Sequence, residues 1–363
     1  MFSIGIVGLP NVGKSLLFKT LTKKEAKVSN YPFCTIEPNK GIIEIPDKRL
    51  NLLFEKIKPE KKISSIIEFI DIAGLVKGAH KGEGLGNQFL EEIRKVDAIL
   101  HLVRGFEEKN VPSSSGEIAP LEDIKIINLE LILSDLAFLE KIIPKIEKEA
   151  KRGNDLFKKK LKILNLFKET LLKEKPLSEI FLTKEEKELV KEYHFLTQKP
   201  QLIVLNIKFN QISLESLGKI KEEIIKKFKK KESEVLTIDV LFENEILEFE
   251  KEEREEFLKE IKGKINSLDD LISSSFKILN LIVFYTFNEK EIRAWEIERE
   301  TPIIEAAKKI HTDFYKNFIK GEVIDWKDFL NYHSWNEAKE KGALNIVGKD
   351  YFLKDGEIIF IKV

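Results

Sequence analysis

The N-terminal part of the chain contains short apolar runs separated by segments with a helical period. Residues 2–8, 66–72 and 98–103 have the length and apolarity of strands that are buried on both faces. The first run leads through a glycine-containing turn into residues 16–21, whose spacing is helical. Strands that alternate with helices in this way predict an α/β fold with a doubly wound sheet.

A helical period begins at Asp123 and continues through two apolar stripes. The first stripe consists of Ile124, Ile127, Leu131, Leu136, Leu139, Ile143 and Ile146. The second follows a polar turn at residues 151–155 and consists of Phe157, Leu161, Leu164, Phe167 and Leu171. Two stripes joined by a polar turn predict an antiparallel helical hairpin. Because residues 200–206 and 234–240 again have the pattern of buried strands, we interpret the hairpin as an insertion within the α/β domain.

A new unit begins after a charged helical segment at residues 250–262. Its pattern predicts a strand at 279–287, a turn at 288–291, a paired strand at 292–298, a helix at 302–318 with Pro302 in its first turn, and short strands at 343–347, 350–353 and 358–363. This order suggests a small β-grasp. The predicted domains are therefore residues 1–122 with 197–277, the helical insertion 123–196, and the C-terminal domain 278–363.

Composition limits the class of protein. The chain has 363 residues, enough for two or three packed units, and its 62 basic and 62 acidic residues give a formal net charge of zero. Any contact with nucleic acid must therefore be regional. A single cysteine, Cys34, excludes an intramolecular disulfide and favours a cytoplasmic location. We expect neither a signal peptide nor a membrane span, because no apolar run approaches about 20 residues.

Residues 8–15, with the sequence Gly-Leu-Pro-Asn-Val-Gly-Lys-Ser, match the phosphate-binding loop pattern. In such a loop, backbone N–H groups surround the phosphates, Lys14 neutralises the β- and γ-phosphates, and Ser15 ligates Mg²⁺. A glycine-rich turn without a ligand is the alternative, which the flanking strand and helix disfavour. Thr35 is the best candidate for a second magnesium ligand, although it is also an ordinary loop threonine.

The second apolar strand ends at Asp71, where a carboxylate can hold a magnesium-bound water, although a strand-ending aspartate is often only a cap. Gly74 offers a backbone N–H to the γ-phosphate. Position 75 is leucine, whereas Ras-type GTPases place a glutamine there to orient the attacking water. Slow intrinsic turnover is therefore predicted, helped by another group, a partner or a monovalent cation such as K⁺. Asn11 is a candidate ligand for that cation or a structural cap.

Base selection should follow the strand at residues 202–205, where guanine-specific relatives carry Asn-Lys-x-Asp. This chain has Asn206, Ile207, Lys208 and Phe209. Phe209 cannot accept the hydrogen bonds of guanine, and unpaired donors cost about 1–3 kcal/mol each. Adenine lacks the 2-amino group, so ATP is favoured. Asn206 can still bond the base, and Ile207 can pack against it.

These residues, together with the segments 30–39, 71–79, 81–89, 293–295 and 310–314, resemble the YchF or Obg-like ATPase family across essentially the whole chain. The resemblance implies a GTPase-like domain that prefers ATP, a coiled-coil insertion, a C-terminal TGS domain and binding to ribosomal particles. It assigns the nucleotide loop to Asn11, Val12, Gly13, Lys14, Ser15 and Leu16, the magnesium ion to Ser15 and Thr35, and the adenine contact to Ile207.

The chain departs from the family at two places that border the base. Phe209 stands where the family usually has an acidic residue, and Asp239 with Val240 stands near a usual Cys/Ser-Ala pair. Strictness of ATP preference is therefore open. Cys34 matches a family cysteine implicated in redox control, and an inert cysteine is the alternative.

The hairpin tip carries a cluster of basic residues: Lys145, Lys148, Lys151, Arg152, Lys158, Lys159 and Lys160. Such a cluster can meet RNA phosphates or simply be a solvated helix face, and the resemblance favours RNA. We predict an ATP hydrolase that uses Mg²⁺, forms a monomer, contacts no membrane, and binds rRNA and ribosomal protein of the large ribosomal subunit. The alternatives are a nucleotide-switched ribosome- or RNA-binding module and a GTPase of the Obg type.

Overall fold

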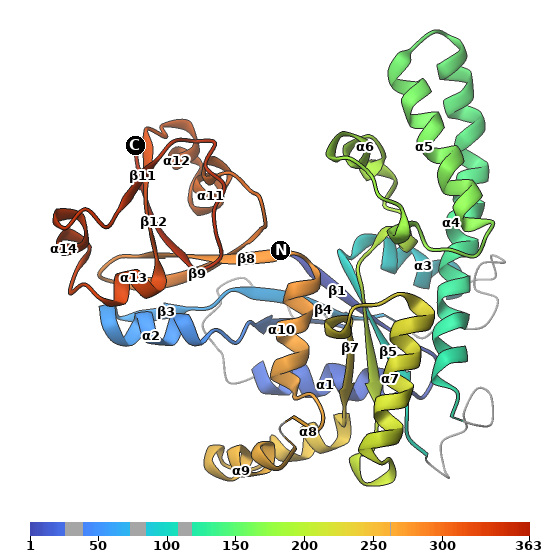
Figure 1. The fold of residues 1–363 in the computed structure, drawn as a ribbon, viewed down its shortest axis with the longest axis horizontal. Helices are drawn as coiled ribbons and strands as arrows, with labels where there is room; N and C mark the ends of the chain where they lie inside the picture. The colour runs from blue at the N-terminus through green and yellow to red at the C-terminus, as the bar shows by residue number, and fades with distance from the viewer. Residues whose placement is uncertain (26–38, 73–84, 108–117, 262) are drawn as a thin grey trace. The chain divides into compact units, whose positions relative to one another are not determined.

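The computed structural model of the protein describes residues 1–25, 39–72, 85–107, 118–261 and 263–363. These residues form two compact units. The N-terminal unit contains residues 2–42 and 68–271, and the C-terminal unit contains Met1 with residues 43–67 and 272–363. Each unit is built around one six-stranded sheet (Figure 1).

The sheet of the N-terminal unit has the strand order β2-β4-β1-β5-β6-β7. Its strands are β1 (Ser3–Val7), β2 (Lys40–Glu44), β4 (Ile66–Asp71), β5 (Ala98–Arg104), β6 (Gln201–Asn206) and β7 (Val235–Ile238). The neighbours from β4 to β7 are all parallel. Their carboxyl ends therefore meet at one edge, where ligands of open α/β sheets bind.

Helices alternate with these strands as the apolar pattern predicts. They are α1 (Lys14–Glu25), α3 (Leu85–Lys95), α4 (Pro120–Lys151), α5 (Asp155–Leu171), α6 (Lys184–Val190), α7 (Leu214–Phe228), α8 (Val240–Ile246), α9 (Lys251–Ile261) and α10 (Leu268–Ile278). Ile124 of α4 and Leu217 of α7 share a buried cluster with Val103 and Leu205 of the sheet. In the described part of the chain, no helix combines the length and apolarity needed to cross a membrane.

The predicted helical hairpin is formed by α4 and α5 (Figure 1). Its turn is set by Asn154, whose side chain accepts a hydrogen bond from the N–H of Leu156 and caps α5. The apolar stripes of the two helices meet in one core, to which Leu139 and Phe167 contribute. Phe195, which follows the hairpin, packs edge-on against Phe167 and closes this core.

A buried carboxylate ties the start of the hairpin to the chain that leaves it. Asp135 of α4 is 0 % exposed, and it accepts hydrogen bonds from the N–H groups of Leu196 and Thr197 at 3.0 and 2.9 Å. The Thr197 hydroxyl donates a third bond at 2.8 Å. Arg94, at the end of α3, lies 3.7 Å away. Burial raises the pKa of Asp135, and these hydrogen bonds and the Arg94 charge oppose that rise.

The sheet of the C-terminal unit has the order β11-β10-β12-β8-β9-β3. Its strands are β3 (Lys61–Ile63), β8 (Leu281–Phe287), β9 (Glu291–Glu298), β10 (Lys320–Asp325), β11 (Asn345–Val347) and β12 (Glu357–Lys362). The β8–β9 hairpin is antiparallel, while β12 runs parallel to β8. The side chains of Ile303, Ala306 and Ala307 on α11 (Ile303–Ile310) pack into the core of this sheet. A mixed sheet that packs on one helix is the predicted β-grasp.

Three local predictions for this unit are wrong in detail. The helix predicted at 302–318 is divided into α11 and α12 (Thr312–Lys316), because His311 between them is extended, with φ −161° and ψ 142°. Residues 350–353 contribute one isolated bridge, between Phe352 and Pro302, and form no strand. The strand β10 was not predicted. The short helices α13 (Trp326–Leu330) and α14 (Trp335–Glu340) follow it.

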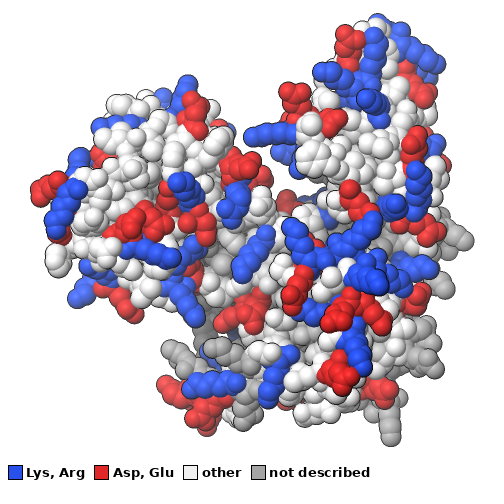
Figure 2. All heavy atoms as spheres, viewed as in Figure 1, with Lys and Arg blue, Asp and Glu red and all other residues white. Residues whose placement is uncertain are grey.

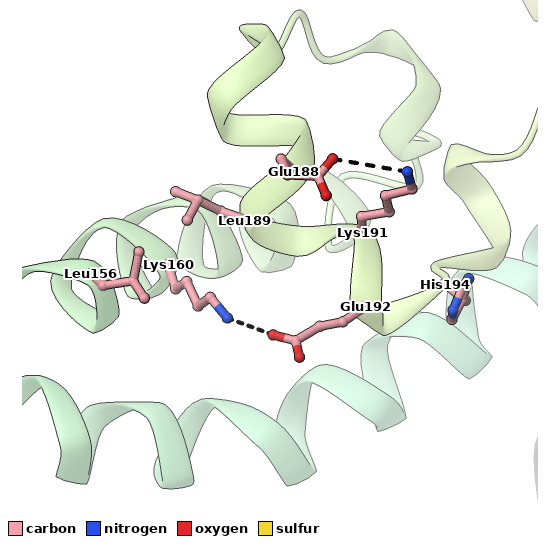
Figure 3. A pocket seen from close by; sticks show the side chains of 7 residues that line it. All are labelled: Leu156, Lys160, Glu188, Leu189, Lys191, Glu192 and His194. Atoms are coloured by element: carbon pink, nitrogen blue, oxygen red, sulfur yellow. Dashed lines mark hydrogen bonds and ion pairs between the residues drawn. The ribbon is translucent and has the colours of Figure 1, made fainter. Parts of the chain in front are cut away.

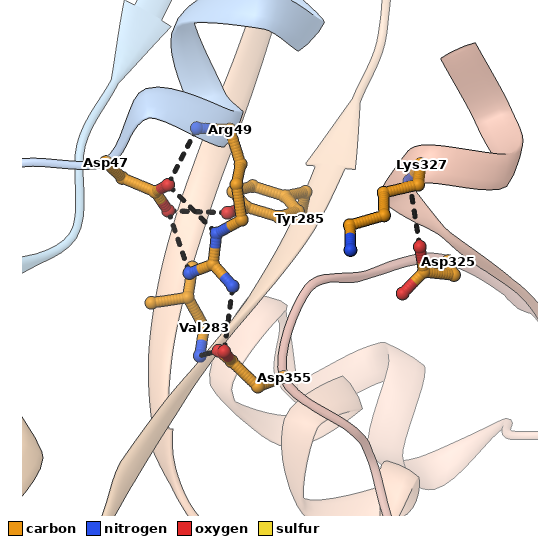
Figure 4. A network of polar contacts seen from close by, with 7 residues as sticks. All are labelled: Asp47, Arg49, Val283, Tyr285, Asp325, Lys327 and Asp355. Carbon is orange, nitrogen blue, oxygen red and sulfur yellow. Dashed lines mark hydrogen bonds and ion pairs between the residues drawn. The ribbon is translucent and has the colours of Figure 1, made fainter.

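Residues 43–67 group with the C-terminal unit, whereas the sequence-based boundaries placed them in the N-terminal domain. This segment contains α2 (Lys48–Ile57) and β3, and β3 pairs in parallel with β9. Asp47 caps α2 and accepts a 2.5 Å hydrogen bond from the Tyr285 hydroxyl (Figure 4). Arg49 joins Asp47 to Asp355 through bonds of 2.9 and 2.8 Å.

Asp47, Arg49 and Tyr285 are mostly buried in this network, whereas Asp355 is exposed. Burial lowers the pKa of Arg49, but the hydrogen bonds to Asp47 and Asp355 and the charge interactions with Tyr285 and Asp47 together outweigh that effect, and the net shift is upward. Burial also raises the pKa of Tyr285, and the neighbouring Asp47 charge raises it further. The guanidinium therefore stays charged and the phenol stays protonated, which preserves the donors that the carboxylates need.

Candidate nucleotide-binding site

The loop of residues 8–15 joins β1 to α1 at the carboxyl edge of the parallel sheet (Figure 1). Asn11 and Gly13 have left-handed backbone conformations, with φ of 64° and 100°. Asparagine is among the few residues other than glycine that adopt this conformation readily. Left-handed residues in such a loop allow successive N–H groups to converge on an anion. The side chain of Val12 is buried and anchors the loop.

Lys14 holds its ammonium group inside the bend of this loop. The side chain is only 9 % exposed, and Nζ donates hydrogen bonds to the carbonyl oxygens of Gly8 and Leu9 at 3.0 and 2.9 Å. Burial lowers the pKa of Lys14, and the charge of Asp71 opposes that shift. The position of the ammonium group is thus fixed by two carbonyl oxygens of the same loop.

Asp71 and Ser15 come together at the same edge. Asp71 is the last residue of β4 and lies in register with Ile6 of β1, just before the loop. The Ser15 hydroxyl lies beside the Asp71 carboxylate and interacts with it. Burial raises the pKa of Asp71, while this interaction and the Lys14 charge oppose the rise. The site therefore presents a hydroxyl and a carboxylate side by side.

Asn206, at the end of β6, contacts the loop directly. Its Nδ2 donates to the Val12 carbonyl at 2.9 Å, and its Oδ1 accepts from the N–H of Val240 at 3.2 Å. A Cβ atom on Gly13 would lie 2.6 Å from Asn206 Nδ2. Glycine at position 13 is therefore required by this close approach as well as by its φ.

The other predicted base-contacting residues are placed as follows. Ile207 is 1 % exposed, and its side chain belongs to the core cluster under α7. The side chain of Phe209 packs partly buried against the same cluster, and its N–H donates to Asp239 Oδ2 at 2.9 Å. The sequence pattern did not predict that Asp239 holds Phe209 and caps α8. Its N-cap role was detectable, because an aspartate directly before a helical stretch is a common N-cap.

Several predicted residues lie outside the described ranges: Thr35, Gly74, Leu75 and Cys34. Their assigned roles stay predictions. Leu16 is half-buried in the first turn of α1, and the Asn11 side chain is exposed. The cation-binding and capping interpretations of Asn11 both stay open.

A buried acid lies one helical turn beyond Asp239. Glu243 of α8 is 4 % exposed, and its Oε1 has no hydrogen-bond partner among the described residues. Burial raises the pKa of Glu243 to about 7, and the backbone hydrogen bond from Leu268 and the Lys24 charge oppose the rise. The charged carboxylate is therefore disfavoured in the folded protein.

Replacing Glu243 by glutamine should make stability less sensitive to pH. Below pH 4.5, the ordinary value, the acid is protonated in both states, so the two proteins should be equally stable. Between pH 4.5 and 7 only the unfolded wild type releases the proton, so the wild type loses stability relative to Glu243→Gln as pH rises. Above pH 7 the variant should be more stable by about 3 kcal/mol.

Urea unfolding of both proteins at several pH values measures this difference. Glu245→Gln alters an exposed residue of the same helix and should follow the wild type throughout. A difference that is constant with pH would contradict a buried, protonated Glu243.

A separate open hollow of about 500 Å³ lies in the helical insertion, between α5 on one side and α6 with the segment that follows it on the other (Figure 3). It is lined by Leu156, Lys160, Glu188, Leu189, Lys191, Glu192 and His194. An ion pair joins Lys160 to Glu192 across it, and a second pair joins Lys191 to Glu188 on one side of it. None of the residues predicted to bind nucleotide lines this hollow.

Two family models match the chain. Residues 3–135 match a model described as "50S ribosome-binding GTPase", and residues 281–363 match YchF-GTPase_C, described as "Protein of unknown function (DUF933)". The first match includes β1, the loop of residues 8–15 and β4.

Full-length relatives decide the family. "Ribosome-binding ATPase YchF" of Bacillus subtilis (strain 168) is 42% identical over 362 residues, which cover 99% of this chain and 98% of that protein. The chain belongs to the YchF family. The YchF protein of Escherichia coli O157:H7, which has the same name, is 43% identical over 99% of this chain and 98% of its own length.

A solved YchF structure has the same fold. The YchF GTPase of Schizosaccharomyces pombe aligns with a TM-score of 0.87 and 33% identity, over 99% of this chain and 97% of that one. The predicted architecture is thereby confirmed: a P-loop α/β domain, an inserted helical hairpin and a C-terminal β-grasp of the TGS type. The bacterial YchF relatives are named ATPases and the yeast YchF a GTPase, so the names alone do not decide the base.

Proposed function

We propose that this chain is a cytoplasmic P-loop ATPase that hydrolyses ATP slowly to ADP and phosphate, and that it binds the ribosome or its large subunit according to its nucleotide state. The relatives named ribosome-binding ATPases support this proposal. The observation that carries it is the arrangement of Lys14, whose buried ammonium is hydrogen-bonded inside a loop that Asn206 also contacts.

Each residue of the site has a distinct role in this proposal. The loop from Asn11 to Leu16 would surround the triphosphate with N–H groups, and Lys14 would neutralise its β- and γ-phosphates. Ser15 and Asp71 fit a magnesium ion, since Mg²⁺ prefers oxygen ligands and these two oxygen-bearing groups already contact each other. Ser15 and Thr35 would bind the ion, with Asp71 holding a bound water. Mg²⁺ would spread the charge that develops on the phosphates.

The proposed turnover is slow because Leu75 cannot orient a water molecule. Gly74 would still donate its N–H to the γ-phosphate. We also propose that K⁺ bound through Asn11, or a ribosomal partner, stimulates this slow hydrolysis. A monomer has the complete set of candidate residues in one chain.

The hairpin tip is the proposed contact with the large subunit and its rRNA. Lys145, Lys148, Lys151, Arg152, Lys158 and Lys159 are all exposed there. Acidic residues lie among them, and Arg152 and Lys158 form ion pairs with Glu149 and Asp155 (Figure 2). Phosphates would have to compete with these exposed pairs, which are weak. Binding should therefore depend on salt concentration.

The preference for ATP is proposed from Phe209, which offers guanine no acceptor. Calorimetric titration of the purified protein with ATP and GTP, in Mg²⁺, tests it. GTP should bind at least about tenfold more weakly, because each unpaired guanine donor costs about 1–3 kcal/mol. Equal or tighter GTP binding would favour the second candidate, a GTPase, which the name of the yeast structure suggests.

A further inference from the structure

The segment of residues 206–209 is held along its length by Ile238, the last residue of β7, and by the two residues that follow it. The N–H of Val240 donates to Asn206 Oδ1 at 3.2 Å, and the N–H of Ile207 donates to the Ile238 carbonyl at 2.9 Å. At the far end, the N–H of Phe209 donates to Asp239 Oδ2 at 2.9 Å. Three hydrogen bonds therefore determine the path of this segment.

Of these three hydrogen bonds, only the one that Asp239 accepts has a carboxylate acceptor. Its side chain is buried, with the residue 8 % exposed, and its second oxygen, Oδ1, accepts from the N–H of Phe242 at 3.0 Å. One oxygen thus caps α8, and the other holds Phe209. Hydrogen bonds to a carboxylate are shorter and stronger than those between neutral groups. The bond to Asp239 is therefore the strongest of the three that hold this segment.

The same segment is joined to the phosphate loop. Asn206 Nδ2 donates to the Val12 carbonyl at 2.9 Å, and Asn206 Oδ1 is bonded by the residue next to Asp239. A continuous set of contacts thus runs from the loop, through Asn206 and the pair Asp239-Val240, to Phe209. The position of residues 206–209 relative to the loop depends on both ends of this set.

We propose that Asp239 is a positioning residue for base binding, acting through the backbone N–H of Phe209 and making no contact with the base itself. The inference rests on the proposed function, because it assumes that residues 206–209 contact the base. In guanine-specific relatives the carboxylate at position 209 bonds the base. Here the carboxylate is at position 239, and each of its oxygens is directed at a backbone donor.

This arrangement explains how a carboxylate can lie beside the segment without favouring guanine. Rotating Asp239 toward guanine donors would break the bond to Phe209 or the cap of α8. Leaving either buried N–H without a partner would cost about as much free energy as a new hydrogen bond from guanine to Asp239 would contribute. Asp239 therefore serves adenine and guanine alike as a support for the segment, and Phe209 retains the discrimination.

Replacing Asp239 by serine isolates the proposed role. A serine hydroxyl still caps α8 at Phe242, but it is too short to hold Phe209 at the same time. We expect ATP affinity to fall about tenfold, because the base must then order a loosened segment. Affinity for inorganic tripolyphosphate should be unchanged, since the phosphate loop keeps its own contacts. Calorimetry with both ligands in Mg²⁺ measures the two effects.

A second pair of variants changes the donor of the Phe209–Asp239 hydrogen bond and leaves its acceptor, Asp239, intact. Phe209→Pro removes the N–H that Asp239 accepts, and Phe209→Ala keeps it. Proline is tolerated here, because Phe209 begins a short 3₁₀ turn, η5 (Phe209–Gln211), and Lys208 before it is extended. The proline variant should bind ATP about tenfold more weakly than the alanine variant, with equal affinity for tripolyphosphate.

Ser213→Ala is the matched control. Ser213 caps α7 by accepting from the N–H of Ser216, so the variant also loses a helix cap in this unit. It should bind ATP like the wild type. The inference is overturned if Asp239→Ser binds ATP within twofold of the wild type, or if it loses ATP and tripolyphosphate affinity equally. If the wild type itself binds neither ligand, the proposed function fails first.

Discussion

Replacing Lys14 by alanine should reduce ATP affinity by at least a hundredfold and bring hydrolysis below detection. The ammonium is buried and held at the loop by the Gly8 and Leu9 carbonyls, so it meets the phosphates without ordering a free side chain. Losing a charge-assisted contact of this kind costs about 3 kcal/mol or more, which corresponds to two decades in affinity. Calorimetry and phosphate release measure the two losses.

The control for this substitution is Lys19→Ala, which removes an exposed lysine from the same helix. It should bind and hydrolyse ATP like the wild type. Circular dichroism should show that Lys14→Ala remains folded, because the lost bonds to the two carbonyls contribute only about 1 kcal/mol each. Retained ATP affinity in a folded Lys14→Ala protein would remove the basis of the proposed site.

Replacing Asp135 by alanine should destabilise the helical insertion by about 3–5 kcal/mol. The carboxylate accepts bonds from the N–H groups of Leu196 and Thr197 and from the Thr197 hydroxyl. Alanine would leave these donors buried without partners and would leave Arg94 without its buried carboxylate. A loss of this size is a large fraction of the 5–15 kcal/mol that stabilises a typical domain.

Two spectroscopic signals separate a local loss from a global one. All three tryptophans, Trp295, Trp326 and Trp335, belong to the C-terminal unit, whereas the hairpin contributes mainly helix. In urea, the helical circular dichroism of Asp135→Ala should therefore fall at lower concentration than in the wild type, while the tryptophan transition should stay in place.

Asp155→Ala is the matched control for this experiment, because it removes an exposed carboxylate of the same hairpin. Its ion pair with Lys158 is exposed, so both transitions should be close to those of the wild type. An unchanged helical transition in Asp135→Ala would show that the buried hydrogen bonds do not hold the insertion.

Elements with a strong local pattern were predicted well. β1, β4 and β5 are short, mainly apolar runs in a parallel sheet, and α4 and α5 have long apolar stripes with a polar turn between them. The strands are recognised by their apolarity and the helices by the period of their apolar residues, so in both cases residues close together in the sequence carry the information. The helix predicted at 302–318 had a good stripe too, but the extended backbone of His311 divides it.

Short segments that form a strand only by pairing with a distant part of the chain were not predicted. β3 has only three residues, of which Lys61 and Lys62 are exposed, and it is a strand because β9 pairs with it. The helix α2 before it was detectable from the sequence, since Asp47 is an N-cap followed by apolar residues at helical spacing. That this segment joins the C-terminal unit depends on contacts with Tyr285 and Asp355, more than 200 residues away.

The sequence by itself determined the chemical character of the site, because a phosphate loop is a continuous motif whose glycines, lysine and serine act within eight residues. It also determined that position 209 offers no carboxylate to a base. Only the tertiary structure decided that Ser15 meets Asp71, that Asn206 bonds the loop, and that Asp239 holds Phe209. These contacts join the ends of different strands, and parallel strands that are distant in the sequence converge only when the sheet forms.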